Sequence, residues 1–202
     1  MPTPRLSVRL ARKDDLVTIE ALAKLATRDL LGPFLDPSQQ IASMEFTALD
    51  PWLIEDQTYF VIEIGGLIRA SGGWSFRDGL VHTKEPVAPT AQIRSTNTAC
   101  LRAMYTDPAM ARKGIGRMVV AIAETSARLA GYTSMELLAT PVGKLLYQGC
   151  GYTVLQDIGL TACNGATFNL AYMAKDLQAP PTGQTNDRES RTPLRHPTGI
   201  TD

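Results

Sequence analysis

The sequence has no net charge, no long apolar run and few cysteine or histidine residues. Its 20 lysine and arginine residues balance 20 acidic residues, so no overall positive field exists that would hold a nucleic acid. No apolar run reaches the roughly 18 residues of a membrane span, and the N-terminal residues lead into no signal-peptide core. We therefore expect a soluble, cytoplasmic protein that binds neither nucleic acid nor membranes.

Cysteine and histidine are also scarce. The three cysteines, Cys100, Cys150 and Cys163, cannot all pair and lack the spacing of a metal site. We interpret them as small buried or half-buried thiols, and we expect no metal ion. A nucleophilic role for Cys150 would need a histidine, and none lies near it in the sequence.

The chain does contain enough apolar sequence for one domain. Apolar residues make up 44% of its 202 residues, which is sufficient for a sizeable core. After Leu177 the composition changes, because prolines recur and apolar residues become rare. We expect residues 1–177 to form the folded domain and residues 178–202 to be a disordered tail.

Hydrophobic periodicity predicts strands and helices along this domain. Strands are expected at Leu6–Leu10, at 58–64 and 67–71 in a hairpin around Gly65-Gly66, at 99–106, at Ser134–Ala139, and at 152–160 and 167–173 in a closing hairpin. Helices are expected from Asp14 or Asp15 to Gly32-Pro33, after Asp36-Pro37, from Ile115 to Gly131, and from Pro141 to Gly149. In the second helix we expect Ile41 and Met44 to face inward. Gly72-Gly73 indicates a bend or a close backbone approach.

The most informative stretch is the glycine turn between the strand at 99–106 and the long helix. Gly114 and Gly116 lack side chains, so an anion can approach the N–H groups at the helix N-terminus, where the helix dipole is positive. The apolar face of this helix is predicted to comprise Ile115, Met118, Val119, Ile122 and Leu129. Three basic residues add positive charge: Arg112, Lys113 and Arg117. The stretch predicts a cradle for phosphate groups, with a plain tight turn and a solvated basic rim as the alternative.

Two familiar phosphate-binding motifs do not match this turn. A dinucleotide fingerprint needs a third small residue three positions after Gly116, where Val119 stands. A P-loop needs Gly-Lys-Ser or Gly-Lys-Thr, which is absent. The cradle is therefore of another kind.

Two motifs in the right order resemble the GNAT N-acetyltransferases. The first is Asp107-Pro108-Ala109-Met110-Ala111-Arg112-Lys113-Gly114-Ile115-Gly116-Arg117, which resembles the family's acyl-CoA signature Q/R-x-x-G-x-G/A, with Ala111 in the Q/R position. The second is Leu146-Tyr147-Gln148-Gly149-Cys150-Gly151-Tyr152, which resembles the family's Tyr-x-x-x-Gly-Phe ending. The resemblance covers most of residues 6–177.

The resemblance implies a fold and a co-substrate. The fold would be α/β (α+β), with a mixed, mostly antiparallel central sheet of about seven strands, flanked by helices and splayed between the fourth and fifth strands. The co-substrate would be acetyl-CoA, whose pantetheine arm pairs with the backbone of Met104, Tyr105 and Thr106. The turn would complete the binding site with Ala111, Arg112, Lys113, Gly114, Ile115, Gly116 and Arg117.

The resemblance also implies a reaction, namely transfer of the acetyl group to the amine of a small molecule by direct attack. Tyr147 stands where the family places a general acid that protonates the CoA sulfur, and a core tyrosine is the alternative. The base is open, because the central strand lacks the glutamate of many relatives. Candidates are Glu136 unless it faces solvent, Asp107 unless it caps the turn, His82 on a long loop, or a water chain.

The sequence gives less information about the acceptor. Phe34 and Trp74 are candidate pocket residues, as are Met44 and Phe46, and core packing is the alternative for each. Transfer of another acyl group, transfer to a hydroxyl, and a catalytically silent acyl-CoA-binding module all stay open. A homodimer is compatible with the sequence.

Overall fold

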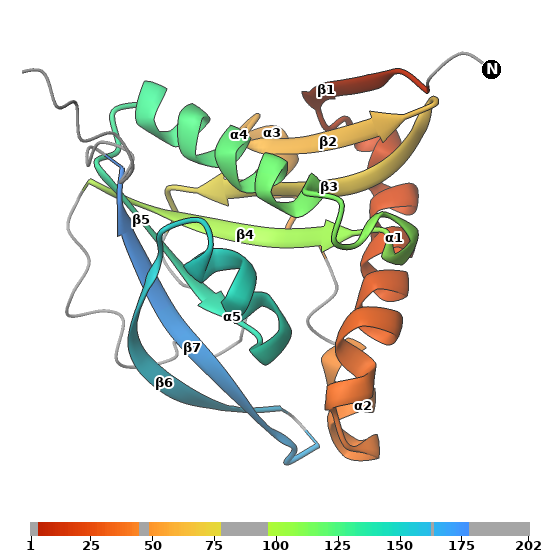
Figure 1. The fold of residues 1–202 in the computed structure, drawn as a ribbon, viewed down its shortest axis with the longest axis vertical. Coiled ribbons are helices and arrows are strands. Elements are labelled where there is room, and N and C mark those ends of the chain that lie inside the picture. The colour runs from red at the N-terminus through yellow and green to blue at the C-terminus, as the bar shows by residue number, and fades with distance from the viewer. Residues whose placement is uncertain (1–3, 45–48, 78–96, 163, 178–202) are drawn as a thin grey trace, which may run out of the picture.

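A mixed β-sheet forms the centre of the molecule. The computed structural model describes residues 4–44, 49–77, 97–162 and 164–177. Within these residues, seven strands form one sheet in the order β1-β2-β3-β4-β5-β7-β6 (Figure 1). Among these seven described strands, β4 and β5 are the only neighbours that pair in parallel. The strands are β1 (Leu6–Leu10), β2 (Tyr59–Ile64), β3 (Leu67–Ser75), β4 (Thr98–Thr106), β5 (Ser134–Ala139), β6 (Thr153–Thr161) and β7 (Thr167–Asp176).

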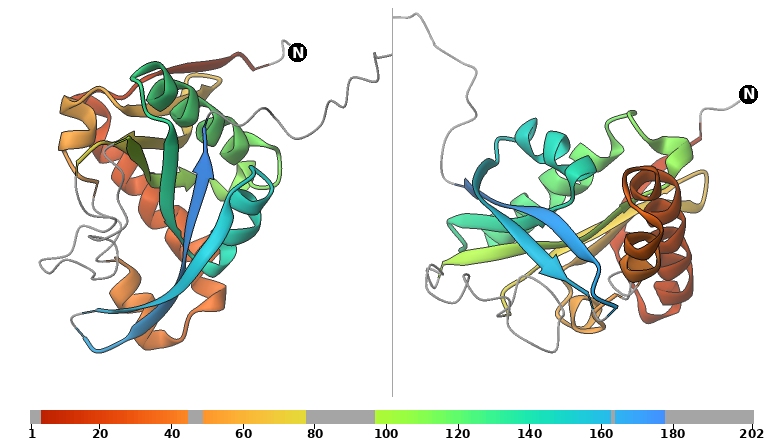
Figure 2. Two further views of the ribbon diagram at one scale, coloured as in Figure 1. Left: turned by 90° about the vertical axis from the view of Figure 1, so that its left-hand side faces the viewer. Right: turned by 90° about the horizontal axis from the view of Figure 1, so that it is seen from below.

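Helices pack on both faces of this sheet (Figure 2). They are α1 (Leu16–Ala26), which continues into a π-helical turn (Thr27–Leu31), α2 (Pro37–Ser43), α3 (Trp52–Glu55), α4 (Ile115–Leu129) and α5 (Pro141–Gln148). On one face the indole N–H of Trp74 in β3 donates to Ser126 of α4. On the other face Tyr59 of β2 packs with Ile19 of α1. The fold class expected from the sequence is confirmed.

Two expectations about which helical residues face inward are wrong. Ile41 is 70% exposed and Met44 40% exposed, because the short helix α2 packs against the β6–β7 hairpin through Ala42 instead. Leu129 is 83% exposed. At 100° per residue it lies about 200° around α4 from the buried Ala127. The buried positions of α4 are Ile115, Val119, Val120, Ala123 and Ala127.

The glycines of the first hairpin are placed as expected. Gly65 and Gly66 have φ of +62° and +79°, which a residue without Cβ adopts readily. A Cβ at Gly72 would collide with Met104, and a Cβ at Gly73 would collide with the backbone and ring of Tyr59. The predicted close approach of the backbone at Gly72-Gly73 is confirmed.

A β-bulge interrupts β4 and was not predicted. Ser71 of β3 pairs with Tyr105, whereas Gly73 pairs with Arg102, so β4 carries one extra residue at this point. Ala103 adopts a left-handed φ of +50°, which is uncommon for a residue with a Cβ. The buried hydroxyl of Tyr59 donates to the Ala103 carbonyl at 2.6 Å. This bond from β2 holds the bulge in place.

The expected splay between β4 and β5 is also present. The two strands pair only at Thr98↔Ser134, Ala99↔Met135 and Cys100↔Glu136. Beyond these pairs β4 remains bonded to β3, and β5 remains bonded to β7. The edge of β4 from Leu101 onward therefore faces an opening in the sheet.

Some sequence predictions concern residues outside the described ranges. They involve Phe46, His82, Cys163 and the segment 178–202, so the disordered tail stays a prediction. No helix in the described ranges is long and apolar enough to cross a membrane.

Candidate active site

The glycine turn leaves the N-terminus of α4 uncapped. Gly114 is the N-cap residue with φ of +81°, and no side chain satisfies the first N–H groups of the helix. The first helical hydrogen bond runs from Met118 N to Gly114 O, so the amides before Met118 have no partner within the helix. A Cβ at Gly114 would meet no atom within 4 Å. These amides therefore face open space at the positive end of the helix dipole, where an anion could approach them.

Basic side chains surround this helix end. Arg112, Lys113 and Arg117 are exposed, and none of them has a carboxylate partner among the residues that the structure describes. Asp107 is the nearby acid, but Arg69 pairs with it and the Ala109 N–H donates to it at 2.8 Å. The net charge of the turn is therefore positive, and Asp107 acts as a cap.

Gly116 connects the turn to the opening in the sheet. A Cβ at this position would lie 3.2 Å from Leu146 Cδ2 and 3.7 Å from Thr106 Oγ1. The start of α4, the end of β4 and the middle of α5 therefore converge at Gly116. A ligand anchored on the α4 amides has the splay between β4 and β5 beside it.

Tyr147 lies on α5 and is 8% exposed. Its ring packs edge-to-face on Tyr152 at 5.9 Å, and Gly143 leaves room for it, since a Cβ there would be 3.1 Å from the ring. The Tyr147 hydroxyl has no hydrogen-bond partner in the described part of the chain. It is not sealed from solvent, in contrast to the buried, unpaired hydroxyl of Tyr152. The hydroxyl proton of Tyr147 is therefore not accepted by any of the described protein groups.

Burial raises the pKa of both tyrosines near the opening. The pKa of Tyr147 is raised above its ordinary value near 10 mainly by burial, and the nearby Cys150 and Tyr105 raise it further. Burial raises the pKa of Tyr105 on β4 to about 12. Both phenols stay protonated at neutral pH, which is the form that a general acid needs.

Glu136 is buried where β4 and β5 separate. It is 2% exposed and belongs to the last pair that joins the two strands, and the Tyr172 hydroxyl donates to it at 2.7 Å. The alternative that Glu136 faces solvent is therefore wrong. β5 lies between β4 and β7 inside the sheet. Glu136 is therefore covered, although the alternating sequence of β5 would also fit a strand with one solvent-exposed face.

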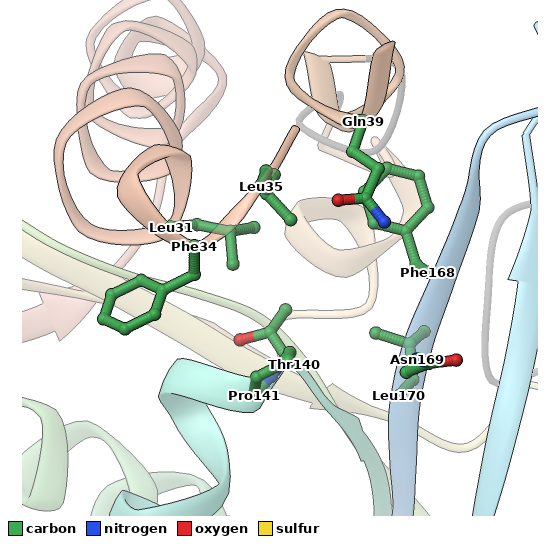
Figure 3. Close-up of a pocket in the computed structure, with 9 residues that line it drawn as sticks. All are labelled: Leu31, Phe34, Leu35, Gln39, Thr140, Pro141, Phe168, Asn169 and Leu170. Atoms are coloured by element: carbon green, nitrogen blue, oxygen red, sulfur yellow. The ribbon is translucent and has the colours of Figure 1, made fainter. Parts of the chain in front are cut away.

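A pocket lies beyond the C-terminal end of β5 (Figure 3). Its volume is about 120 Å³, and Figure 3 shows Phe34 and Leu31 on one side, Gln39 and Phe168 on the other, and Thr140 between them. A second cavity of about 360 Å³ shares Pro141, Asn169 and Leu170 with it. The two cavities extend along the start of α5.

Comparison with known proteins identifies the family. Residues 19–152 match the model of the acetyltransferase (GNAT) family. The chain belongs to this family. It is accordingly an acyltransferase, and acetyl-CoA is its co-substrate.

Solved structures support the fold of this acetyltransferase. It is similar to a GCN5-related N-acetyltransferase from Rhodopseudomonas palustris at 14% identity and a TM-score of 0.65, over 87% of this chain and 98% of that chain. YncA of Salmonella typhimurium, solved with its cofactor acetyl-CoA, matches at 18% identity and a TM-score of 0.58, over 90% of this chain and 99% of that chain. The ribosomal-protein-S18-alanine N-acetyltransferase of Escherichia coli matches at 12% identity and a TM-score of 0.57, over 89% of this chain and 99% of that chain. No curated protein matches the sequence.

The acetyltransferase fold places the predicted residues in three groups. The β4 residues Met104, Tyr105 and Thr106 lie beside the opening, the turn from Ala111 to Arg117 lies at its mouth, and Tyr147 lies on α5. Phe34 lines the pocket, whereas Trp74 has the surroundings of a core indole. Sequence reasoning missed Gln39, Phe168 and Asn169 of the pocket, because these residues come from segments that are distant in sequence and carry no local signal.

Proposed function

We propose that this acetyltransferase transfers the acetyl group of acetyl-CoA to the amine of a small-molecule acceptor by direct attack. One observation carries the proposal: the uncapped N-terminus of α4 adjoins the opening between β4 and β5, and Gly116 is the point where they meet. One extended ligand could thus place its anionic group on the α4 amides and its reactive group in the opening between β4 and β5.

The residues at the turn fit the pyrophosphate of acetyl-CoA. The amides from Gly114 to Arg117 would donate to its oxygens, and Arg112, Lys113 and Arg117 would balance its charge. The edge of β4 at Met104, Tyr105 and Thr106 would pair with the pantetheine arm, since β5 has moved away from it. Ala111 offers no side-chain contact, so we assign its contribution to the backbone.

Tyr147 would act as the general acid. The acceptor nitrogen forms a bond to the thioester carbonyl carbon, the C–S bond breaks, and Tyr147 gives its proton to the departing sulfur. An N–H of β4 near Tyr105 or Thr106 would stabilise the charge on the carbonyl oxygen. The amine proton would go to Glu136, to His82 or to a water chain, because both carboxylate oxygens of Asp107 are occupied.

The pocket at Phe34 supports a small acceptor. Its own volume of about 120 Å³ is below the roughly 300 Å³ at which pockets for drug-sized ligands begin, so it would hold only part of an acceptor, and the adjoining cavity of about 360 Å³ would hold the rest. Its lining is mainly apolar, with Phe34 and Phe168 supplying the rings and Gln39 and Asn169 supplying amides. A side chain of moderate size on the acceptor would fill it.

A panel of acceptors tests the proposal. Acetyl-CoA is incubated with the protein and with small amines, alcohols or short peptides, and free thiol release is followed with mass spectrometry of the product. We expect release above the hydrolysis background with at least one small amine, and a product that has gained one acetyl group on nitrogen. Transfer only to hydroxyls, only to peptides, or only from another acyl-CoA would contradict the proposal. A lack of release with every acceptor would favour a silent acyl-CoA-binding module.

A further inference from the structure

Arg102 on β4 has an unusual environment for an arginine. Its side chain is half-buried, and its Nε atom is fully buried without a hydrogen bond. No carboxylate within the described ranges lies within 4 Å of its guanidinium nitrogens. A buried charge without a partner is costly, so such groups usually have an opposite charge beside them.

The other arginines in the described part of the chain show what is ordinary in this protein. Four of them pair with carboxylates, namely Arg9, Arg28, Arg69 and Arg77. Five have no such pair and are exposed, so water solvates them: Arg5, Arg12, Arg112, Arg117 and Arg128. Arg69 also has a buried Nε atom without a hydrogen bond, but it pairs with Asp107. Arg102 is half-buried and has no carboxylate partner among the described residues, so it belongs to neither group.

The register of the sheet places Arg102 at the opening, on the face opposite α4. Arg102 pairs with Gly73, whose missing Cβ would point at Tyr59 and so at the α1 face. It lies two residues after Cys100, the last residue of β4 that pairs with β5. It also directly precedes the bulge at Ala103. An acceptor that approaches from the α1 face would meet Arg102 beside the reaction centre.

The charges on this face indicate which anion would pair with Arg102. Glu136 lies on the same face of the sheet as Arg102, because its pairing partner Cys100 is two residues from Arg102. The Tyr172 hydroxyl donates a hydrogen bond to Glu136. A phosphate dianion would bring two negative charges next to Glu136 with one arginine to balance them. A carboxylate matches the single charge and the planar donor geometry of a guanidinium.

We propose that Arg102 binds a carboxylate of the acceptor, so that the substrates are amines that also carry a carboxylate. The proposal rests on the proposed function and names its substrate class. Arg102 would determine specificity, whereas the acetyl transfer itself would still depend on Tyr147.

Matched acceptors test this proposal directly. Each accepted amine is compared as an amino acid and as its amide, with kcat/KM measured for both. The parent should prefer the acid about 10- to 100-fold, the usual strength of hydrogen bonds to a charged group. In Arg102→Gln the acid should lose this preference while the amide keeps its rate. Arg102→Lys, which retains the charge, should restore part of the preference. The exposed Arg128→Gln should leave the ratio unchanged.

Stability separates this role from a structural one. Removing a half-buried charge that has no carboxylate partner should leave the melting temperature of Arg102→Gln unchanged or raised. A parent that does not prefer the acid would overturn the proposal. So would equal losses for acid and amide in Arg102→Gln together with a lower melting temperature. In both cases amine acetylation itself would stand. If neither the amino acids nor their amides cause thiol release from acetyl-CoA, the proposed function fails as well.

Discussion

Tyr147→Phe is expected to lower kcat by about 10² or more while leaving folding and acetyl-CoA binding close to those of the parent. The substitution keeps the ring that packs on Tyr152 and deletes only the hydroxyl. A thiol has a pKa near 8.5, so a thiolate expelled at neutral pH gains from a proton delivered as the C–S bond breaks. Turnover of any accepted amine is the measurement, with acetyl-CoA binding followed separately.

Tyr152→Phe is the matched control. It removes a hydroxyl from the partner ring, but that hydroxyl is fully buried, so a substrate cannot reach it to take its proton. Its kcat should stay within a few-fold of the parent. A Tyr147→Phe rate equally close to the parent would show that Tyr147 is a core residue and that water supplies the proton.

The pH profile gives a second test of the acid. Burial raises the pKa of Tyr147 above its ordinary value near 10, so the protonated, active form persists as the pH rises. We expect no alkaline loss of kcat from Tyr147 up to about pH 10. A loss in the neutral range that disappears in Tyr147→Phe would contradict a raised pKa.

Gly116→Val is expected to abolish stabilisation by acetyl-CoA. The parent should melt at higher temperature with acetyl-CoA, because a ligand bound only by the native state adds about 4 kcal/mol at 1,000 times its Kd. A branched side chain at Gly116 would fill the space between Leu146 and Thr106 that connects the turn to the opening. The increment caused by acetyl-CoA is the quantity to compare, since the new contact with Leu146 also affects the protein without ligand.

Gly159→Val is a suitable control for this change. Gly159 lies on β6, where a Cβ would make only an ordinary contact with Thr167 at 3.6 Å, away from the turn. The control should keep the full increment. If Gly116→Val folds and acetyl-CoA still stabilises it, the cradle has been placed at the wrong residues.

Local patterns in the sequence were enough for most of the fold. Alternation located β1 and β5 to the residue, and the paired glycines at 65 and 66 located the first hairpin. The bulge in β4 could not be found in this way. It depends on the Tyr59 hydroxyl, which reaches Ala103 from a strand 44 residues away, and Ala103 itself gives no sign of a left-handed backbone.

The site divides along the same line. The turn at 111–117 and Tyr147 belong to short motifs, so the sequence was sufficient to nominate them. The sequence left open whether Glu136 faces solvent, because alternation on β5 does not show that its neighbours cover both faces. Arg102 did leave a local signal, a charge in a mostly apolar strand, but only the structure shows that its Nε atom is buried without a hydrogen bond to any described residue.

The decisive measurement is a structure of the protein with acetyl-CoA bound. We expect the pyrophosphate on the amides from Gly114 to Arg117, the pantetheine arm along β4 between Met104 and Thr106, and the thioester sulfur within hydrogen-bond distance of the Tyr147 hydroxyl. Acetyl-CoA bound elsewhere, or bound at the turn with its sulfur pointing away from the opening between β4 and β5, would contradict it.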